Sequence, residues 1–188
     1  MVGQLLDNVI KSTKSSKYFG TFRIALAPLM LWFFVDRNNP IFSSWHPSWF
    51  DYFAGLIFVV ASVTDFFDGF IARNWNQMTK LGGILDPLAD KMLVLAGFIG
   101  LIVIDRASAW AVFLILSREF FITGLRVVAV SEGKDVASTM AGKIKTVVQM
   151  IAIGFLTMNW PFATEILWLA VILTIYSGYE YTRDYFKN

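Results

Sequence analysis

The stretch DFFDGFIARNWNQMTKLGGILDPLAD, residues 65–90, places four aspartates inside strongly apolar sequence. Its pattern is D-x-x-D-G-x-x-A-R, a spacer of eight residues, and then G-x-x-x-D-x-x-x-D. Each charged residue costs roughly 2.5–3.5 kcal/mol at the centre of a bilayer, so four unpaired carboxylates would cost on the order of 10 kcal/mol. A chain that keeps such residues is therefore expected to bind something positively charged among them.

The composition of the chain indicates an integral membrane protein. Of its 188 residues, 56% are hydrophobic and 16% are charged, whereas a soluble domain has about 25% charged residues. There is no cysteine, which excludes disulfides and thiolate metal sites. The net charge of +2 is too small to indicate a nucleic-acid partner. The length predicts a single membrane domain over residues 1–188.

Six apolar stretches have roughly the length that crosses a bilayer, about 17–25 residues. The expected fold is therefore all-α, an integral membrane bundle of six transmembrane helices. Before them, residues 1–17 set apolar side chains beside lysines, which favours a short amphipathic helix on an anionic membrane surface, with a frayed tail as the alternative. The expected spans are Phe19–Val35, Tyr52–Ile71, Ile84–Ile104, Ala107–Val130, Ile144–Asn159 and Ala163–Tyr179.

Lysine and arginine gather in alternate connections between these spans, and this predicts the orientation of the chain. The opposite connections hold only Arg37 and Arg106. Because cytoplasmic loops carry the excess of basic residues, both termini are expected to face the cytoplasm. The basic residues on that side are Lys11, Lys14, Lys17, Arg73, Lys80, Lys134, Lys143, Arg183 and Lys187.

The four aspartates fall on one face of each of two expected helices. At 100° per residue, Asp65 and Asp68 share a face of the second helix, and Asp86 and Asp90 share a face of the third. Pro87 is expected in the first turn of that third helix, where proline is tolerated. If the two faces meet, four carboxylates converge at the cytoplasmic boundary of the membrane.

Ligation by carboxylate oxygens alone suits a hard divalent cation, Mg²⁺ or Mn²⁺. Four converging carboxylates could hold two such ions, and two ions can clamp the attacking and leaving oxygens of a displacement at phosphorus. The alternative is a polar plug in which the acids pair with Arg73, Lys80 and Lys91.

At every specified position, residues 65–90 resemble the signature of the CDP-alcohol phosphotransferases. The resemblance implies a six-helix membrane enzyme, usually a homodimer. Such an enzyme transfers a phosphatidyl group from CDP-diacylglycerol to an alcohol and releases CMP.

The resemblance also implies roles for individual residues. Asp65, Asp68 and Asp86 would bind one divalent cation, and Asp65, Asp86 and Asp90 would bind the other. Asp90 would also act as the catalytic base that takes the proton from the attacking hydroxyl. The positions that match contacts to the CDP portion of the donor are Gly69, Arg73 and Thr79.

Four cations in the fourth and fifth expected spans are candidates for binding the acceptor. Arg118 and Arg126 are about 80° apart in helical projection and could line one wall, while Lys143 and Lys145 open the next span. Cations at membrane depth are functional candidates, and a cationic pocket suits an acceptor that carries a phosphate. The alternatives are that Arg118 pairs with Glu119 and that the lysines only mark the orientation.

Residues 118–126 and 142–150 further resemble the bacterial phosphatidylglycerophosphate synthases of this family. That resemblance implies glycerol 3-phosphate as acceptor, and a multi-pass location in the bacterial inner (cytoplasmic) membrane with a cytoplasmic active site. Two other acceptors stay open within the family, inositol phosphate and serine, although serine has no phosphate for the cations to bind. A divalent-cation transporter is the alternative from another class.

Overall fold

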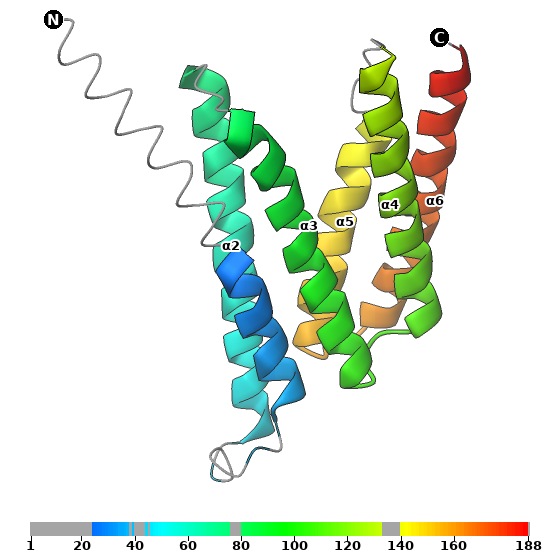
Figure 1. The fold of residues 1–188 in the computed structure, drawn as a ribbon. Coiled ribbons are helices and arrows are strands. Elements are labelled where there is room, and N and C mark those ends of the chain that lie inside the picture. Colours follow the sequence, from blue (N-terminus) through cyan, green and yellow to red (C-terminus); the bar gives the residue numbers. More distant parts are fainter. Residues whose placement is uncertain are drawn as a thin grey trace, which may run out of the picture. The chain divides into compact units, whose positions relative to one another are not determined.

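The computed structural model describes residues 24–37, 39, 44, 46–75, 80–132 and 140–187. For residues 65–75, 80–90 and 130 the description covers the backbone alone. Within these ranges the regular structure is entirely helical, which confirms the all-α prediction (Figure 1). The helices are Ile24–Val35, α2 Pro47–Trp75, α3 Lys80–Val103, α4 Ala109–Ser131, α5 Met140–Thr157 and α6 Ala163–Lys187.

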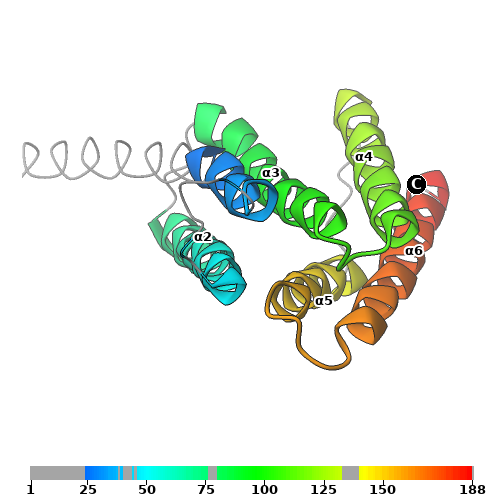
Figure 2. The same cartoon turned by 90° about the horizontal axis from the view of Figure 1, so that it is seen from below.

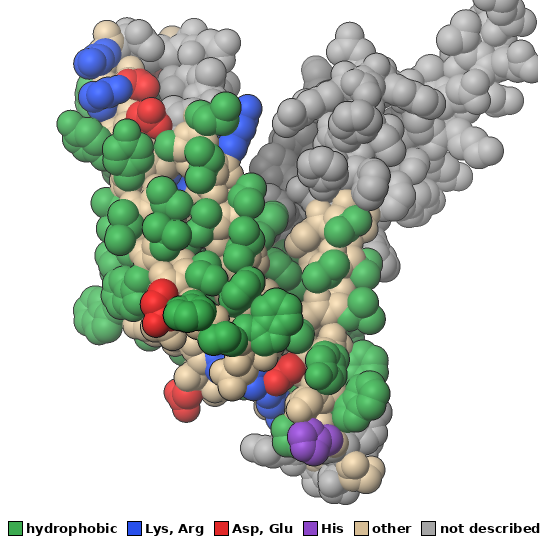
Figure 3. Space-filling model, turned by 180° about the vertical axis from the view of Figure 1, so that it is seen from behind, with side chains coloured by type: hydrophobic (Ala, Val, Ile, Leu, Met, Phe, Trp, Pro, Cys, Tyr) green, Lys and Arg blue, Asp and Glu red, His purple; other side chains and the backbone are tan. Residues whose placement is uncertain are grey.

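Within the described part of the chain, two helices contain a stretch that is long and apolar enough to cross a membrane, Pro47–Thr64 in α2 and Met140–Thr157 in α5. Hydrophobic side chains also cover most of the described surface that is visible in Figure 3. An apolar surface of this extent is typical of contact with lipid. The six-span bundle stays a prediction, and the expected amphipathic segment, residues 1–17, lies outside the described residues.

Helix α2 begins five residues before the expected Tyr52, because its start is capped. The backbone N–H of Ser48 donates to Nδ1 of His46 at 3.3 Å, so the histidine ring accepts from a helix N–H that has no partner within the helix. Pro47 occupies the first helical position, where its missing N–H costs nothing. The loop expected between the first two spans is therefore shorter than the hydropathy suggested.

The expectation that Pro87 opens the third helix is wrong. Helix α3 begins at Lys80, so the proline is its eighth residue and lies in the helix interior. The residues before it, including Gly82 and Gly83, continue the helical backbone. A proline there leaves the carbonyl four residues earlier without its usual N–H donor.

Helices α3 and α5 end with the same hydrogen-bond pattern. Asp105 and Asn159 adopt positive φ angles of 56° and 53°. The next residues, Arg106 and Trp160, each donate a backbone N–H to the carbonyl five positions earlier, at 2.9 and 3.0 Å. This pattern satisfies carbonyls that a helix end would otherwise leave unpaired. Arg106 also donates to the carbonyl of Thr157 at 2.6 Å, where α5 ends.

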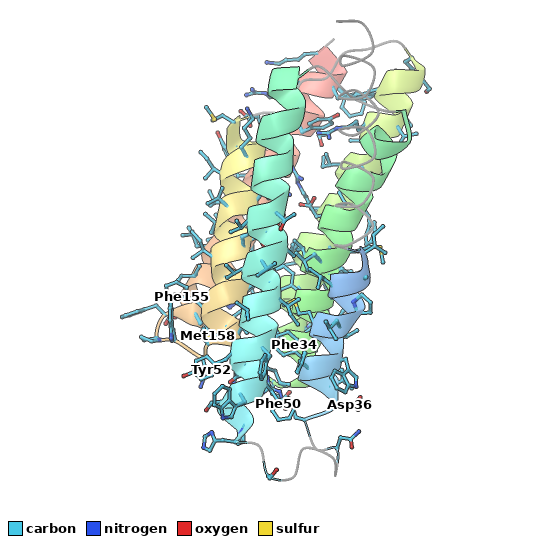
Figure 4. The ribbon with its side chains drawn as sticks, turned by 90° about the vertical axis from the view of Figure 1, so that its left-hand side faces the viewer. Phe34, Asp36, Phe50, Tyr52, Phe155 and Met158 are labelled. Atoms are coloured by element: carbon cyan, nitrogen blue, oxygen red, sulfur yellow. The ribbon has the colours of Figure 1, made fainter. Side chains whose placement is uncertain are left out.

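The chain divides into two compact units, Met1–Gly100 and Leu101–Asn188. In the first unit, the helix Ile24–Val35 contacts both α2 and α3. The ring of Phe33 stacks on that of Phe53 with 5.5 Å between centroids. Phe34, which Figure 4 labels, is buried against Gly100, where an added Cβ would lie only 2.2 Å from the Phe34 ring. The single-domain prediction is not decided by this division.

In the second unit, α6 contacts both α4 and α5 (Figure 2). The buried face of α6 is polar as well as apolar, since it includes Thr174, Ser177 and Tyr181. The side-chain amide of Gln149 on α5 donates to the hydroxyl of Thr174 at 2.9 Å, and both side chains are buried. A buried polar contact of this kind fixes the register of two helices, because a shift would leave both groups unpaired.

Candidate active site

The helical backbone of the first unit carries the four predicted aspartates. Helix α2 runs without a break through Asp65 and Asp68, and α3 runs through Asp86 and Asp90. At 100° per residue, the first pair is about 60° apart and the second about 40° apart, so each pair shares a helix face as expected. The side chains of all four aspartates lie outside the described residues, and the convergence of the two pairs stays a prediction.

The predicted donor-binding residues fall in the same region of the chain. Gly69 and Arg73 are on the helical backbone of α2, with side-chain positions outside the described residues. Thr79, between α2 and α3, is outside them altogether. A pattern of only oxygen donors fits Mg²⁺ or Mn²⁺ rather than zinc or copper, so the chemistry of the four aspartates agrees with the predicted cations.

In the second unit, two of the four predicted cations share one carboxylate. Oε1 of Glu119 is 3.4 Å from Nη1 of Arg118, and the same oxygen accepts from the ammonium of Lys145 on α5. All three side chains are largely buried, since Arg118 is 12% exposed, Glu119 is 18% exposed and Lys145 is 6% exposed. Charges at such depth are stable only when paired. The sequence had offered Glu119 only as a partner of Arg118, whereas the structure shows that it links α4 to α5.

Arg118 also reaches α6. Its Nη2 donates to the hydroxyl of Ser177 at 2.6 Å. At the next position, a Cβ added to Gly178 would lie 3.0 Å from Cγ and 3.3 Å from Nε of Arg118. The absence of a side chain at Gly178 therefore gives the arginine room to lie across the helix. Sequence reasoning missed both α6 residues, and the only signal for them is a pair of small residues inside an apolar helix.

Arg126 is exposed, and its guanidinium lies over the ring of Tyr181, 5.9 Å from the centroid. Arg126 lies close enough to Arg118 for the two like charges to repel each other, and Tyr181 is one helical turn after Ser177, the α6 residue that accepts from Arg118. We call Arg118, Glu119, Arg126, Lys145 and Tyr181 the cationic cluster.

Lys143 lies apart from the cationic cluster. It is two residues from the buried Lys145, which places the two lysines about 200° apart around α5. Lys143 is accordingly exposed. Of the four predicted acceptor-binding residues, the structure thus brings together Arg118, Arg126 and Lys145, but not Lys143.

Comparison with known proteins gives the same family as the motif. The family model described as CDP-alcohol phosphatidyltransferase matches residues 16–176. A Bacillus subtilis relative, 48% identical over 67% of this chain and 69% of its own length, is named "CDP-diacylglycerol--glycerol-3-phosphate 3-phosphatidyltransferase". The same name is given to relatives from Rickettsia typhi, 35% identical over 88% of this chain and 93% of that protein, and from Escherichia coli K12, 36% identical over 85% and 88%. The apolar helices of this chain and its likeness to a membrane-associated enzyme family indicate a membrane location. The chain belongs to the CDP-alcohol phosphatidyltransferase family.

Proposed function

We propose that the protein transfers the phosphatidyl group of CDP-diacylglycerol to sn-glycerol 3-phosphate, giving phosphatidylglycerol phosphate and CMP. The observation that carries this proposal is the set of relatives named for that reaction, which are 35–48% identical over most of this chain. The signature in residues 65–90 supports the transfer chemistry, and the cationic cluster supports a phosphorylated acceptor.

The aspartates of α2 and α3 would hold the metal ions. The family in general depends on divalent cations, and an all-oxygen donor set suits Mg²⁺ or Mn²⁺. Two such ions, when bound, neutralise the pyrophosphate and stabilise charge on the attacking and leaving oxygens. The proposed ligands are Asp65, Asp68, Asp86 and Asp90.

The chain's own groups would bind the donor and move one proton. Arg73 would pair with the pyrophosphate oxygens, and Gly69 and Thr79 would contact the rest of the CDP portion. Asp90 would accept the proton of the acceptor hydroxyl while the hydroxyl oxygen forms a bond to the phosphorus that carries diacylglycerol. The bond from that phosphorus to the bridging oxygen then breaks, and CMP leaves with the bridging oxygen.

The cationic cluster would hold the phosphate of the acceptor. Among its described residues, the cluster holds three cations and the one carboxylate of Glu119, which leaves an excess of positive charge, and phosphate is well suited to arginine and lysine donors. Serine has no phosphate and would leave that charge uncompensated. Inositol phosphate would compensate it, so glycerol 3-phosphate is favoured over inositol phosphate by the names of the relatives rather than by charge.

We further propose a multi-pass protein of the bacterial inner membrane, with both termini and the active site on the cytoplasmic side. The distribution of lysine and arginine supports this orientation. A homodimer is proposed from the family resemblance, and membrane lipid would surround the exposed apolar side chains.

The experiment is a transfer assay with the purified protein in mixed micelles of detergent and CDP-diacylglycerol, with Mg²⁺ or Mn²⁺ present. Glycerol 3-phosphate, inositol phosphate and serine are supplied separately, and CMP release and the lipid product are measured. We expect CMP and phosphatidylglycerol phosphate with glycerol 3-phosphate alone. Turnover with another acceptor, and none with glycerol 3-phosphate, would overturn the proposed substrate. Metal movement into vesicles without CMP release would support a transporter instead.

A further inference from the structure

Two buried hydrogen-bond donors in the second unit have no hydrogen-bond partner among the described residues. They are Nε of Arg118 and the hydroxyl of Tyr181, whose side chain belongs to a residue only 2% exposed. Folded proteins pair nearly all of their buried polar groups, so two neighbouring unpaired donors need an acceptor that the described side chains do not supply. Among the described residues of this unit, the other unpaired buried atom is Oε2 of Glu180, which is an acceptor when ionised and cannot donate to an anion.

The two donors belong to one group of side chains. Tyr181 lies beneath the guanidinium of Arg126, 5.9 Å from ring centroid to the guanidinium carbon. It is one helical turn after Ser177, which accepts a hydrogen bond from Arg118. Both α6 residues are on the buried face of that helix. Tyr181 therefore faces the helices that carry the cations rather than lipid.

The unpaired donors and the net positive charge of this group suit an anion with several oxygens. Each terminal nitrogen of Arg118 makes one hydrogen bond, to Glu119 and to Ser177, while its buried Nε makes none among the described residues. Arg118 and Arg126 repel each other, and the carboxylate of Glu119 is shared with Lys145. A phosphate monoester would relieve the repulsion and accept from both unpaired donors.

We propose that the hydroxyl of Tyr181 donates a hydrogen bond to the phosphate of the acceptor, beside Arg118 and Arg126, so that α6 contributes to acceptor recognition. This inference rests on the proposed function. Tyr181 is then a binding residue that acts through its hydroxyl, while its ring supports the guanidinium of Arg126.

The test is the variant Tyr181→Phe, which removes one oxygen and keeps the ring. We expect the KM for glycerol 3-phosphate to rise about tenfold, as expected for loss of a hydrogen bond to a charged group. The kcat and the KM for CDP-diacylglycerol should stay within about twofold of wild type. The matched control is Tyr179→Phe, two positions away on α6 and 66% exposed, and it should leave all three constants unchanged.

An unchanged acceptor KM in folded Tyr181→Phe would overturn the inference, and so would equal losses for donor and acceptor, which indicate a structural role. If the wild-type protein releases no CMP with glycerol 3-phosphate, the proposed function fails by itself. Calorimetric binding of inorganic phosphate then tests the inference separately. Weaker binding by Tyr181→Phe than by wild type supports it, and equal binding overturns it.

Discussion

The acidic stretch of the first unit and the cationic cluster of the second are built in opposite ways. The aspartates lie within residues 65–90, on two consecutive helices, with a spacing that is visible in the sequence. The cationic cluster draws on α4, α5 and α6, from Arg118 to Tyr181. It also contains its own counter-charge, because Glu119 accepts from two of its cations.

The meaning of a charged residue in an apolar helix thus depends on whether the protein itself supplies the counter-charge. Four acids at helical spacing favour a bound cation, because self-compensation would need several basic partners at matching depth. A cation such as Arg118 is ambiguous, since it pairs within the protein and still keeps an unpaired donor. Substitutions can therefore distinguish residues that only pair within the protein from residues that bind a ligand.

The largest effect is expected in the acidic stretch. Asp65→Asn or Asp86→Asn should lower CMP release by roughly a thousandfold or more, because each acid would serve both cations and each cation stabilises developing charge. Asp184→Asn, on an exposed acid of α6 that pairs with Arg183, is the control and should keep its activity. Full activity in a folded Asp65 or Asp86 variant would contradict the two-cation proposal.

Asp90→Asn tests whether Asp90 acts as the general base, a role that the other three aspartates are not expected to have. Loss of a general base costs about 10²–10⁴ in rate, so turnover should fall by that range while CDP-diacylglycerol binding stays largely intact. Donor affinity is measured by calorimetry beside the rate of CMP release. If Asp90→Asn loses donor affinity as severely as Asp65→Asn, Asp90 is chiefly a metal ligand and the base must be sought elsewhere.

In the cationic cluster, Arg118→Ala or Lys145→Ala should weaken the use of glycerol 3-phosphate roughly ten- to a hundredfold. Hydrogen bonds to charged groups contribute roughly 1.5–3 kcal/mol, and about 1.4 kcal/mol corresponds to a factor of ten. Donor and acceptor concentrations are varied separately in each variant.

The matched comparison for that prediction is Lys143→Ala, which removes the same side chain from the exposed side of α5. Its acceptor KM should change by less than about threefold. A larger effect at Lys143 than at Lys145 would mean that the acceptor binds outside the cationic cluster. A loss of donor affinity in Arg118→Ala, with normal acceptor use, would assign these cations to the donor and reopen inositol phosphate and serine.

The smallest effect is expected from Gly178→Ala. The added methyl would press on Cγ and Nε of Arg118, so the arginine must shift by a few tenths of an ångström, and we expect the acceptor KM to rise about threefold. Gly124→Ala on α4 is the control, because nothing lies within 4 Å of its added Cβ, and alanine should only favour the helix. Equal acceptor KM values in the two variants would show that the position of Arg118 tolerates the shift.

Apolar stretches in the sequence predicted the helical class and the helices on which the four aspartates, Arg118, Arg126 and Lys145 lie, but they placed some helix ends wrongly, so that Arg73 and Lys143 fell outside the expected spans. Helix α6 continues to Lys187, past the expected Tyr179, because backbone hydrogen bonding does not require apolar side chains. The early starts of α2 and α3 have a similar cause, since neither the cap at His46 nor the helical backbone through Gly82 and Gly83 depends on apolar side chains.

The sequence by itself determined the acidic stretch, because helical spacing alone brings residues three and four positions apart onto one face. It also determined the family, through a motif that is contiguous in the chain. Which cations belong together depends on the contacts of α6 with α4 and α5, and these contacts are visible only in the folded chain. Lys143 and Lys145 are equally basic in sequence, yet one is exposed and the other is buried against Glu119. Burial is a property of the packed helices, and a local pattern cannot encode it when the neighbours are far away in the chain.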